Sequence, residues 1–595
     1  MRSSLRPLLT LWGEPRPLPG LAASAAQPIP WTLLLGLSLV YMAFGLSGHG
    51  PWRGDDLLGV ASARQVLLAW FDGYGSSLVP NLGGAVLGRD GPLPSWIMAA
   101  WVAPHEALSR LFWGHGLSAE RFDDLCRLAG GLCLMIGLVA LWRATDRLAR
   151  RREAQPTDPL GIGPSAAALG RTLADCSVLI ALACLGSITR WHEAGPASVS
   201  FMVTALLVWA LAMAPEHPIR SGRFMGLLLT AILLTDGPEA ALAWGLGLVL
   251  ACGLAQPWRL AAKRLALEAS WALGLSAGIY VLLAQGLAGP LHGQWWQQQL
   301  SWDPEPLGAL RTWAWTWWPI WPMVTVLAIQ AIGHGLWKLA HIRLISGLSI
   351  VITLLALLGP GLAEPKQFLP VAPLAVLAAF GLLSMPRSLT NLLDWFAVVV
   401  FTSLGALIWL YWSAMSFGFP KNLANRLSFF APGLQNLAPG PLEVFLGVAI
   451  SGAWLVLVLW RIRRGRPRLW RPVVLSAGGL SLAWILMMSL WLPALDINRG
   501  YGKVSPRLER AVALQGSGCL QAPDQDRLAR AIALITHGVE LGLLGQDQHC
   551  PLLFLQAGPS GFKPPNQAEL VWSGQPAPDR KDRERFALYR LNDKK

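Results

Sequence analysis

The stretch that decides the fold reads LAGGLCLMIGLVALW from Leu128 to Trp142 and continues as RATDRLARRR from Arg143 to Arg152. Its first part carries no charge and is close to the length that crosses a bilayer as a helix. Its second part contains five arginines. Because basic residues gather at the cytoplasmic ends of spanning helices, this pattern predicts a span that ends in the cytoplasm.

Apolar runs of this kind recur along the chain of 595 residues, of which 53% are hydrophobic and only 14% charged. This balance is too apolar for a soluble protein of this size. We therefore predict an all-α polytopic membrane protein of about thirteen spans, with its N-terminus inside and its C-terminus outside. Further spans are expected at Trp31–Ser47, Phe201–Ala214, Ala269–Leu287, Pro319–Gly335, Leu344–Leu358, Leu369–Leu383, Phe396–Trp412, Leu442–Trp460 and Val473–Leu492.

The formal net charge of +14 would suggest a nucleic-acid partner if the protein were soluble. The basic residues instead form clusters, at 143–152, 259–264 and 461–471, which alternate with loops poor in lysine and arginine. That alternation is the positive-inside pattern of a membrane protein. We therefore expect membrane lipids, and no nucleic acid, among the partners.

Cofactor motifs are not evident. The sequence shows no glycine-lysine nucleotide loop, which disfavours an ATP-driven pump, and no metal-ligand spacing, so the cofactor stays open and a divalent metal remains an option. Two of the seven cysteines, Cys519 and Cys550, lie in polar sequence that the topology places outside. In an oxidising periplasm these two are expected to pair as a disulfide.

The chain divides into three parts. Residues 1–30 are expected to be cytoplasmic, residues 31–492 to form the membrane part, and residues 493–595 to form a small α/β domain outside. A long external segment, about residues 48–122, follows the first span. Within it Leu57–Phe71 and Trp96–Phe112 show helical apolar spacing with interleaved tryptophans, which is typical of helices lying at a membrane surface.

The C-terminal tail is polar and ordinary in composition. A helix is expected over Asp526–Leu544, and apolar strands are expected at Leu552–Leu555, Leu570–Trp572 and Phe586–Leu591. The last two are interpreted as a closing pair. These elements are the basis for expecting an α/β domain.

Two adjacent acids, Asp55 and Asp56, stand just beyond the first span and before an amphipathic helix. An acid in this place can simply cap the helix and interact with its dipole. The functional alternative is a general base, because a fixed carboxylate can take the proton of an attacking hydroxyl or amine.

Two further acids, Asp236 and Glu239, follow a short apolar run, Phe224–Thr235, of about a dozen residues, which is expected to stop partway through the membrane. Polar backbone at that depth is tolerated where it is buried in protein or lines a wet cavity. Ionisable side chains within a membrane are costly and usually functional. The sequence therefore predicts a cavity that opens outward.

Several stretches together resemble the lipid-linked-sugar transferases of the GT-C superfamily, specifically the aminoarabinose transferase and protein mannosyltransferase group. Asp55, Asp56 and Arg64 resemble the acidic pair and following arginine of that group. The stretch Gly91–Trp96 resembles its proline-containing motif. The family usually has an acid and then a lysine before that motif, whereas this chain has Arg89 and Asp90.

The resemblance extends to three later places. The turn containing His192 and Glu193 resembles a polar turn of the family, although a solvated turn is an equally good interpretation. Asp236 stands in a hairpin where the family commonly has a lysine. Lys366 opens a lysine-aromatic-proline stretch, although a lysine that snorkels to the interface would look the same.

The resemblance implies an inverting glycosyltransferase, a hexosyl- or pentosyltransferase, that moves a sugar from a polyprenyl-phosphate donor to a lipid, glycan or protein acceptor. It implies a bacterial inner-membrane enzyme whose active site faces the periplasm. Asp55 would act as the base beside Asp56, the cations would hold the donor phosphate, and the remaining polar residues would line the acceptor cavity. The expected phosphate-binding residues are Arg64, Arg89 and Lys366, and the expected cavity residues are Asp90, His192, Glu193, Asp236 and Glu239.

The rival interpretation is a lipid or glycan transporter, or a flippase, without transferase activity. Such proteins also need a cavity and charges within the membrane. Transporters are often built from repeated halves, and no repeat is detectable in this sequence.

Overall fold

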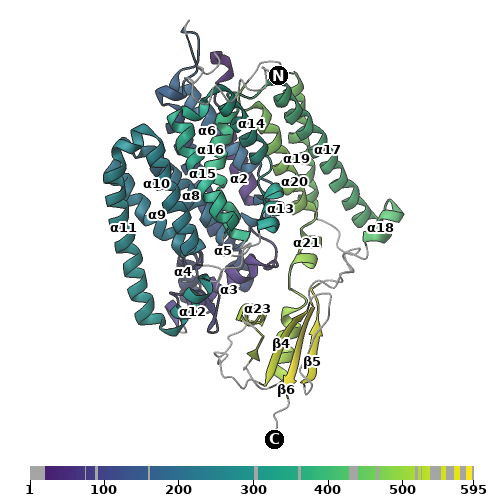
Figure 1. Cartoon of the computed structure of the whole chain (residues 1–595). Coiled ribbons are helices and arrows are strands. Elements are labelled where there is room, and N and C mark those ends of the chain that lie inside the picture. The colour runs from purple at the N-terminus through teal and green to yellow at the C-terminus, as the bar shows by residue number, and fades with distance from the viewer. Residues whose placement is uncertain are drawn as a thin grey trace.

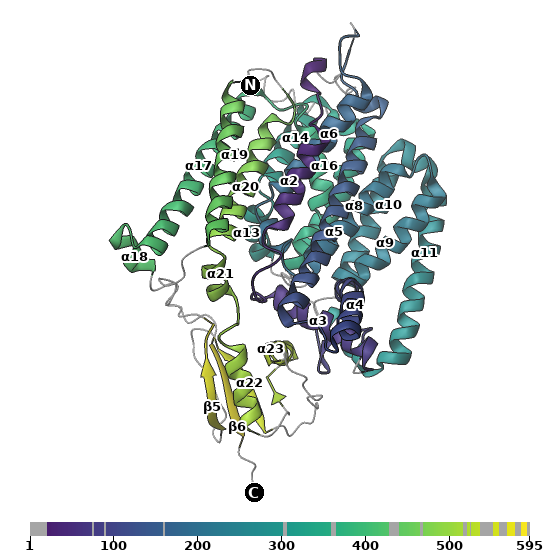
Figure 2. The same cartoon turned by 180° about the vertical axis from the view of Figure 1, so that it is seen from behind.

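A computed structural model describes most of the chain as a helical bundle with a small sheet at one end (Figure 1). The first described residues, drawn in dark purple, lie at the opposite end of the bundle from the sheet, and the view from behind in Figure 2 agrees. The described residues are 21–73, 76–87, 91–158, 161–300, 306–358, 364–427, 440–463, 468–515, 520–523, 525–535, 551–557, 568–576 and 585–591.

Six helices of the described part are long and apolar enough to cross a membrane. Five shorter apolar helices accompany them, so the prediction of a polytopic helical membrane protein is confirmed. The total of about thirteen spans and their orientation stay predictions. The long helices are α5 (Ala119–Ala149), α8 (Pro196–Met213), α11 (Gln256–Ala288), α17 (Arg387–Phe417), α19 (Pro441–Arg463) and α20 (Arg471–Leu490). The shorter ones include α2 (Trp31–Ala43), α10 (Pro238–Leu254), α14 (Ile320–His334), α15 (Ala340–Leu358) and α16 (Val371–Gly381).

The bundle has an interior and a lipid-facing rim. In α8 and α20, 78% of the most apolar stretch of the helix is buried, whereas the buried share of that stretch is 22% in α11 and 17% in α19. α5 packs tightly against α8, because Gly137 has no side chain where a Cβ would lie 2.8 Å from Phe201. Helices of the first kind form the core, and helices of the second kind present leucine and valine to the acyl chains.

The predicted length of the helix before the hairpin that contains Asp236 is wrong. That helix, α9 (Pro218–Asp236), has 19 residues instead of about a dozen and is roughly 28 Å long, and its depth in the membrane stays a prediction. It is longer because Pro218 starts the helix at its first turn, and Arg220 and Arg223 lie in turns that the apolar run did not include. Gly237, with φ of +92°, then reverses the chain into α10.

The first external segment forms two helices, α3 (Asp55–Phe71) and α4 (Leu93–Trp113), within three residues of the expected bounds. Between them lies a hairpin of β1 (Asn81–Leu82) and β2 (Ala85–Val86), which no pattern in the sequence predicts. The last turn of α4 leaves Leu111, Phe112 and Trp113 exposed. Exposed apolar and aromatic side chains on such a helix favour a position at the membrane surface.

The C-terminal region contains a four-stranded sheet in the order β3-β4-β6-β5. β3 and β4 are parallel and the other pairs are antiparallel. Three of the strands, β4, β5 and β6, cover the stretches expected from the sequence, whereas β3 was not expected. The second half of the expected helix lies outside the described residues, as do Cys519 and Cys550. The elements are α21 (Leu492–Arg499), α22 (Ser505–Leu514), β3 (Leu520–Gln521), α23 (Gln525–Ile535), β4 (Leu552–Ala557), β5 (Ala568–Gly574) and β6 (Arg585–Leu591).

This region packs against the first external segment. Leu57 of α3 and Leu82 and Ala85 of the hairpin share one apolar core with Ile532 and Phe554. The backbone also joins the two regions, because Trp52 forms a bridge with Gly500 and the N–H of Arg53 donates to the carbonyl of Arg499 at 3.0 Å. The start of α3 is therefore held from two sides.

Candidate active site

Asp55 and Asp56 are the first two residues of α3, and their side chains have different surroundings. Asp56 is completely buried. Its carboxylate accepts hydrogen bonds from the N–H groups of Trp52 at 2.8 Å and Ala194 at 2.7 Å. Burial alone would raise its pKa, but the neighbouring Arg127 guanidinium and these hydrogen bonds hold the pKa of Asp56 below its usual value. Asp56 is therefore a fixed buried anion.

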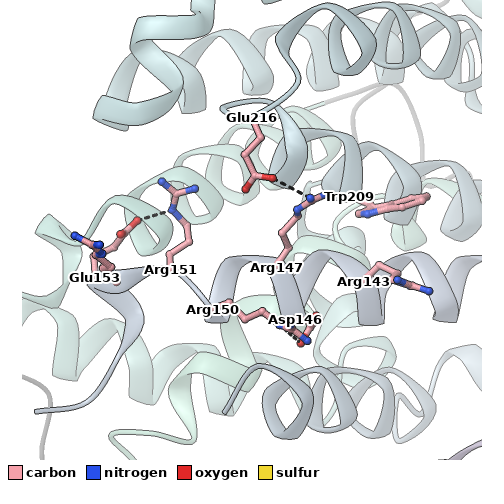
Figure 3. A pocket seen from close by; sticks show the side chains of 9 residues that line it. Arg143, Asp146, Arg147, Arg150, Arg151, Glu153, Trp209 and Glu216 are labelled. Atoms are coloured by element: carbon pink, nitrogen blue, oxygen red, sulfur yellow. Dashed lines mark hydrogen bonds and ion pairs between the residues drawn. The ribbon is translucent and has the colours of Figure 1, made fainter. Parts of the chain in front are cut away.

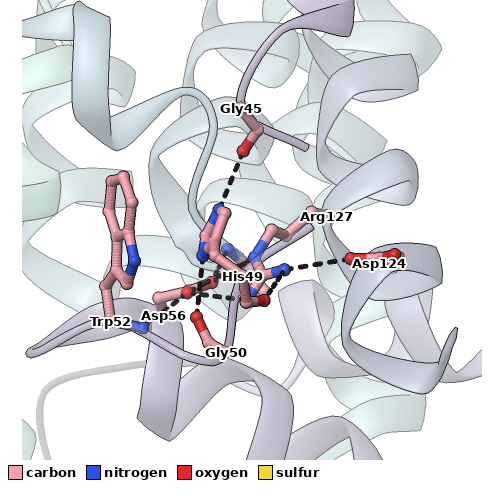
Figure 4. Close-up of polar contacts among 8 residues, drawn as sticks. Gly45, His49, Gly50, Trp52, Asp56, Asp124 and Arg127 are labelled. Carbon is pink, nitrogen blue, oxygen red and sulfur yellow. Dashed lines mark hydrogen bonds and ion pairs between the residues drawn. The ribbon is translucent and has the colours of Figure 1, made fainter. Parts of the chain in front are cut away.

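Arg127 is the centre of the network around Asp56 (Figure 4). This fully buried arginine of α5 donates from Nε and Nη2 to the Asp56 carboxylate at 3.2–3.3 Å. Its Nη1 donates to the carbonyl of His49 at 3.1 Å and to Asp124 at 3.3 Å. The His49 ring stacks on Trp52 with centroids 4.2 Å apart. The network thus joins three parts of the chain: the turn of His49 before α3, the start of α3, and α5.

Arg127 was not among the expected site residues, although a signal for it existed. It stands directly before the uncharged run 128–142, where an arginine is costly unless it is paired. The acids Asp123 and Asp124, one helical turn earlier, were a further sign of a paired charge.

Asp55 points away from this network. Its Oδ2 lies 3.2 Å from Nη1 of Arg190, and the same Nη1 lies 2.9 Å from Oε2 of Glu193. The side chain of Asp55 is 23% exposed, whereas that of Glu193 is 7% exposed. Asp55 is therefore the accessible member of the acidic pair, and it shares one guanidinium with a buried glutamate.

Glycines allow this close arrangement. Gly54, with φ of +90°, is the residue before α3. A Cβ on Gly59 would lie 1.5 Å from the carbonyl oxygen of Ala194, so α3 rests directly on the backbone of the turn that carries Arg190. Any side chain at Gly59 would push α3 away from that turn.

The turn of His192 and Glu193 is buried, so its interpretation as a solvated turn is wrong. Burial raises the pKa of Glu193 to about 7, and the nearby Arg190 opposes that shift. Burial lowers the pKa of His192 to about 4. The His192 ring faces the carbonyls of Ile188 and Tyr41 at 2.7 and 2.8 Å, so it packs inside the protein and does not join Asp55.

A second polar group lies at the hairpin between α9 and α10. Asp236 is buried, and both of its carboxylate oxygens accept from the Ser200 hydroxyl, at 2.7 and 2.8 Å. Glu239 receives Lys366, whose Nζ lies 3.3 Å from Oε2. The ammonium of Lys366 is also close enough to act on Asp236 electrostatically. The structure thus brings three of the expected residues together.

The two groups are connected through aromatic packing. Lys366 lies in the short helix η4 (Glu364–Phe368). The ring of Phe368 contacts that of Trp191, next to Arg190, with centroids 6.2 Å apart. Both groups therefore lie at the same end of the bundle, the end that carries the sheet (Figure 1).

The other expected phosphate-binding residues are not part of either group. The Arg64 guanidinium lies over the ring of Phe122, 4.6 Å from its centroid. Nine residues along α3 place Arg64 on the opposite face from Asp55 and roughly 13 Å further along the axis. Arg89 and Asp90 lie outside the described residues. The described residues contain no cluster of three or more His, Cys, Asp or Glu that would hold a metal ion.

Comparison with known proteins identifies the fold. No family model and no curated protein matches the sequence. Among solved structures, ArnT from Cupriavidus metallidurans bound to undecaprenyl phosphate is similar, with a TM-score of 0.57 and 14% identity. The match covers 94% of this chain and 97% of that one. The apo ArnT structure has a TM-score of 0.56, 15% identity and the same coverage. The chain therefore has the fold of ArnT.

Proposed function

We propose that the protein transfers a sugar from a polyprenyl-phosphate donor to a lipid, glycan or protein acceptor at the periplasmic face of a bacterial inner membrane. The observation that carries this proposal is the difference in burial between the two adjacent acids. Asp56 is a buried structural anion, whereas Asp55 is partly exposed beside Arg190 at the sheet end of the bundle. A carboxylate placed in this way suits a general base.

In the proposed reaction, an acceptor hydroxyl or amine attacks the anomeric carbon of the donor sugar. The bond between that carbon and the phosphate oxygen breaks, and its electron pair leaves with the polyprenyl phosphate. Asp55 takes the proton of the attacking group. Attack from the face opposite to the leaving phosphate inverts the anomeric centre. Asp56 does not touch the reactants, and it positions Asp55 through the start of α3.

The developing charge on the phosphate requires a cation. Lys366 and Arg190 are candidates for this cation, because each lies at the sheet end and has a partly exposed side chain, 18% and 21% exposed. Each is paired with an acid, so the incoming phosphate would compete with Glu239 or with Asp55 and Glu193. Asp236 and Glu239 offer carboxylates to an acceptor amine or hydroxyl. ArnT, which has the same fold, is seen with undecaprenyl phosphate.

The test is a transfer assay with the full chain in nanodiscs and a synthetic undecaprenyl-phosphate sugar. Asp55→Asn should lower transfer about 10²- to 10⁴-fold while leaving thermal unfolding unchanged. Asp72→Asn is the matched control, because Asp72 ends the same helix and forms an ion pair with Arg110 at 3.3 Å and 32% exposure.

An Asp55→Asn variant with full activity would refute the assignment of the base. A membrane-sidedness assay separates the rival interpretation. A flippase mutant would leave the donor on the cytoplasmic side, whereas a transferase mutant would leave donor unused outside and the acceptor unmodified.

A further inference from the structure

The bundle has a polar hollow at the end opposite to Asp55. It has a volume of about 640 Å³ and is drawn in Figure 3. This volume is within the usual range for sites that hold small molecules, roughly 300–1,000 Å³. The hollow is lined by Arg143, Asp146, Arg147, Arg150, Arg151, Arg152, Glu153, Trp209 and Glu216.

The hollow has a net positive charge that its internal ion pairs do not cancel. Three of its arginines are paired within it: Arg147 with Glu216 at 2.8 Å, Arg150 with Asp146 at 2.9 Å and Arg151 with Glu153 at 2.7 Å. Five arginines against three acids leave a formal charge of +2. The excess belongs to Arg143 and Arg152, which are exposed and form no ion pair with any carboxylate that the structure describes.

The positions of the arginines near helix ends explain part of this charge. They do not explain why side chains from different segments line the same hollow. Arginines at the C-terminal end of α5 interact favourably with the helix dipole, and the positive-inside rule accounts for a basic loop. Neither effect requires side chains from three segments to face one hollow. α5 supplies Arg143, the 3₁₀ turn η2 (Arg152–Ala154) supplies Arg152, and Glu216 comes from the turn between α8 and α9.

The ligand chemistry follows from the side chains. Guanidinium groups bind phosphate oxygens in a bidentate way and are less strongly hydrated than ammonium groups, so arginine suits a phosphate better than lysine does. Trp209 stands one helical turn before the end of α8, and tryptophan in that place belongs at the interface between headgroups and acyl chains. Basic pockets between spanning helices on the cytoplasmic side bind the headgroups of anionic lipids.

We propose that this hollow binds the phosphate-bearing headgroup of an anionic phospholipid of the leaflet at that end of the bundle. Assigning that leaflet to the cytoplasm rests on the orientation in the proposed function. The contacts within the hollow do not depend on that orientation. The site is distinct from the one where the donor is proposed to bind, because the two lie at opposite ends of α5.

The test is lipid binding to the purified full chain, measured by native mass spectrometry and by thermal stabilisation. The probes are phosphatidylglycerol and cardiolipin, with phosphatidylcholine, glycerol 3-phosphate and inorganic phosphate for comparison. Arg143→Gln combined with Arg152→Gln should weaken binding of the two anionic lipids about tenfold. Both side chains are exposed, so thermal unfolding without added lipid should not change.

The matched control removes two positive charges nearby. Arg259→Gln combined with Lys263→Gln affects exposed residues in the first turns of α11 at the same end of the bundle, and should change binding less than twofold. Equal losses in both double variants would overturn the proposal in favour of diffuse attraction. Binding of inorganic phosphate as tight as that of phosphatidylglycerol would overturn the lipid assignment. Asp55→Asn should leave lipid binding intact, so failure here and failure of the proposed reaction are distinguishable.

Discussion

The two ends of α5 carry charge in opposite ways. At the sheet end, Arg127 is fully buried and its partner Asp56 comes from 71 residues away. At the other end, Arg150 pairs with Asp146 within one helical turn and remains 42% exposed. Burial makes the first pair a condition of folding, whereas water screens the second. In this molecule the fully buried charge pair is structural, whereas the exposed charges at the other end of α5 remain available for binding.

Removal of Arg127 should have the largest effect on stability. Arg127→Leu should lower the free energy of unfolding by about 3–5 kcal/mol, because the buried Asp56 carboxylate loses its cation. The measurement is the thermal unfolding of the purified chain in detergent. Combining it with Asp56→Leu should restore part of the loss, and a single variant as stable as the native chain would contradict the structural role.

A steric test probes how closely α3 must approach the turn of Arg190. Gly59→Ala should cost about 1–3 kcal/mol and also reduce transfer, because the new methyl group forces α3 away from the Ala194 carbonyl. Gly274→Ala in α11 is the control, since no atom lies within 4 Å of its added Cβ. Equal unfolding temperatures for the two variants would show that the contact is not required.

The pH dependence tests the buried side of the Asp55 group. Because the pKa of Glu193 rises from 4.5 to about 7 on folding, the folded state binds more protons between these values. Stability should therefore fall as pH rises from about 4.5 to 7, by an amount of order 3 kcal/mol. Comparison of Glu193→Gln with the native chain isolates this contribution, which the variant should lack. A native-minus-variant difference that does not change with pH would contradict it.

The smallest effect is expected at the opposite end. Arg152→Gln should change the free energy of unfolding by no more than about 0.5 kcal/mol in the absence of lipid, because its side chain is exposed. Thermal unfolding measures this directly. A loss comparable to that of Arg127→Leu would remove the distinction between the two ends.

The elements of the fold were largely predictable from local pattern. α5 follows from an uncharged run with a basic end, and α3 and α4 follow from helical apolar spacing. Three strands of the C-terminal sheet, β4, β5 and β6, follow from short apolar stretches in polar sequence, whereas the two-residue strand β3 is too short to give such a pattern. The length of α9 was not predicted, because a helix continues through charged turns when its end is solvated, and an apolar run does not mark that end.

The site was predictable in its residue types but not in its pairings. Asp55 was expected to be a base and that assignment stays a proposal. Its partner Arg190 is 135 residues away, and no local spacing indicates such a contact. Lys366 and Glu239, 127 residues apart, were assigned separately to phosphate and acceptor, yet they form one ion pair. Tertiary packing decides such contacts, and a single sequence does not reveal it.

The backbone bridge between Trp52 and Gly500 gives the C-terminal region a role in the membrane part of the molecule. A chain shortened after Leu492 would keep every spanning helix and both acids. It would lose Gly500, the bridge partner of Trp52, and most of the apolar core that packs against α3. The C-terminal region therefore supports the start of α3. Truncated chains are unsuited to activity measurements even when they insert normally into the membrane.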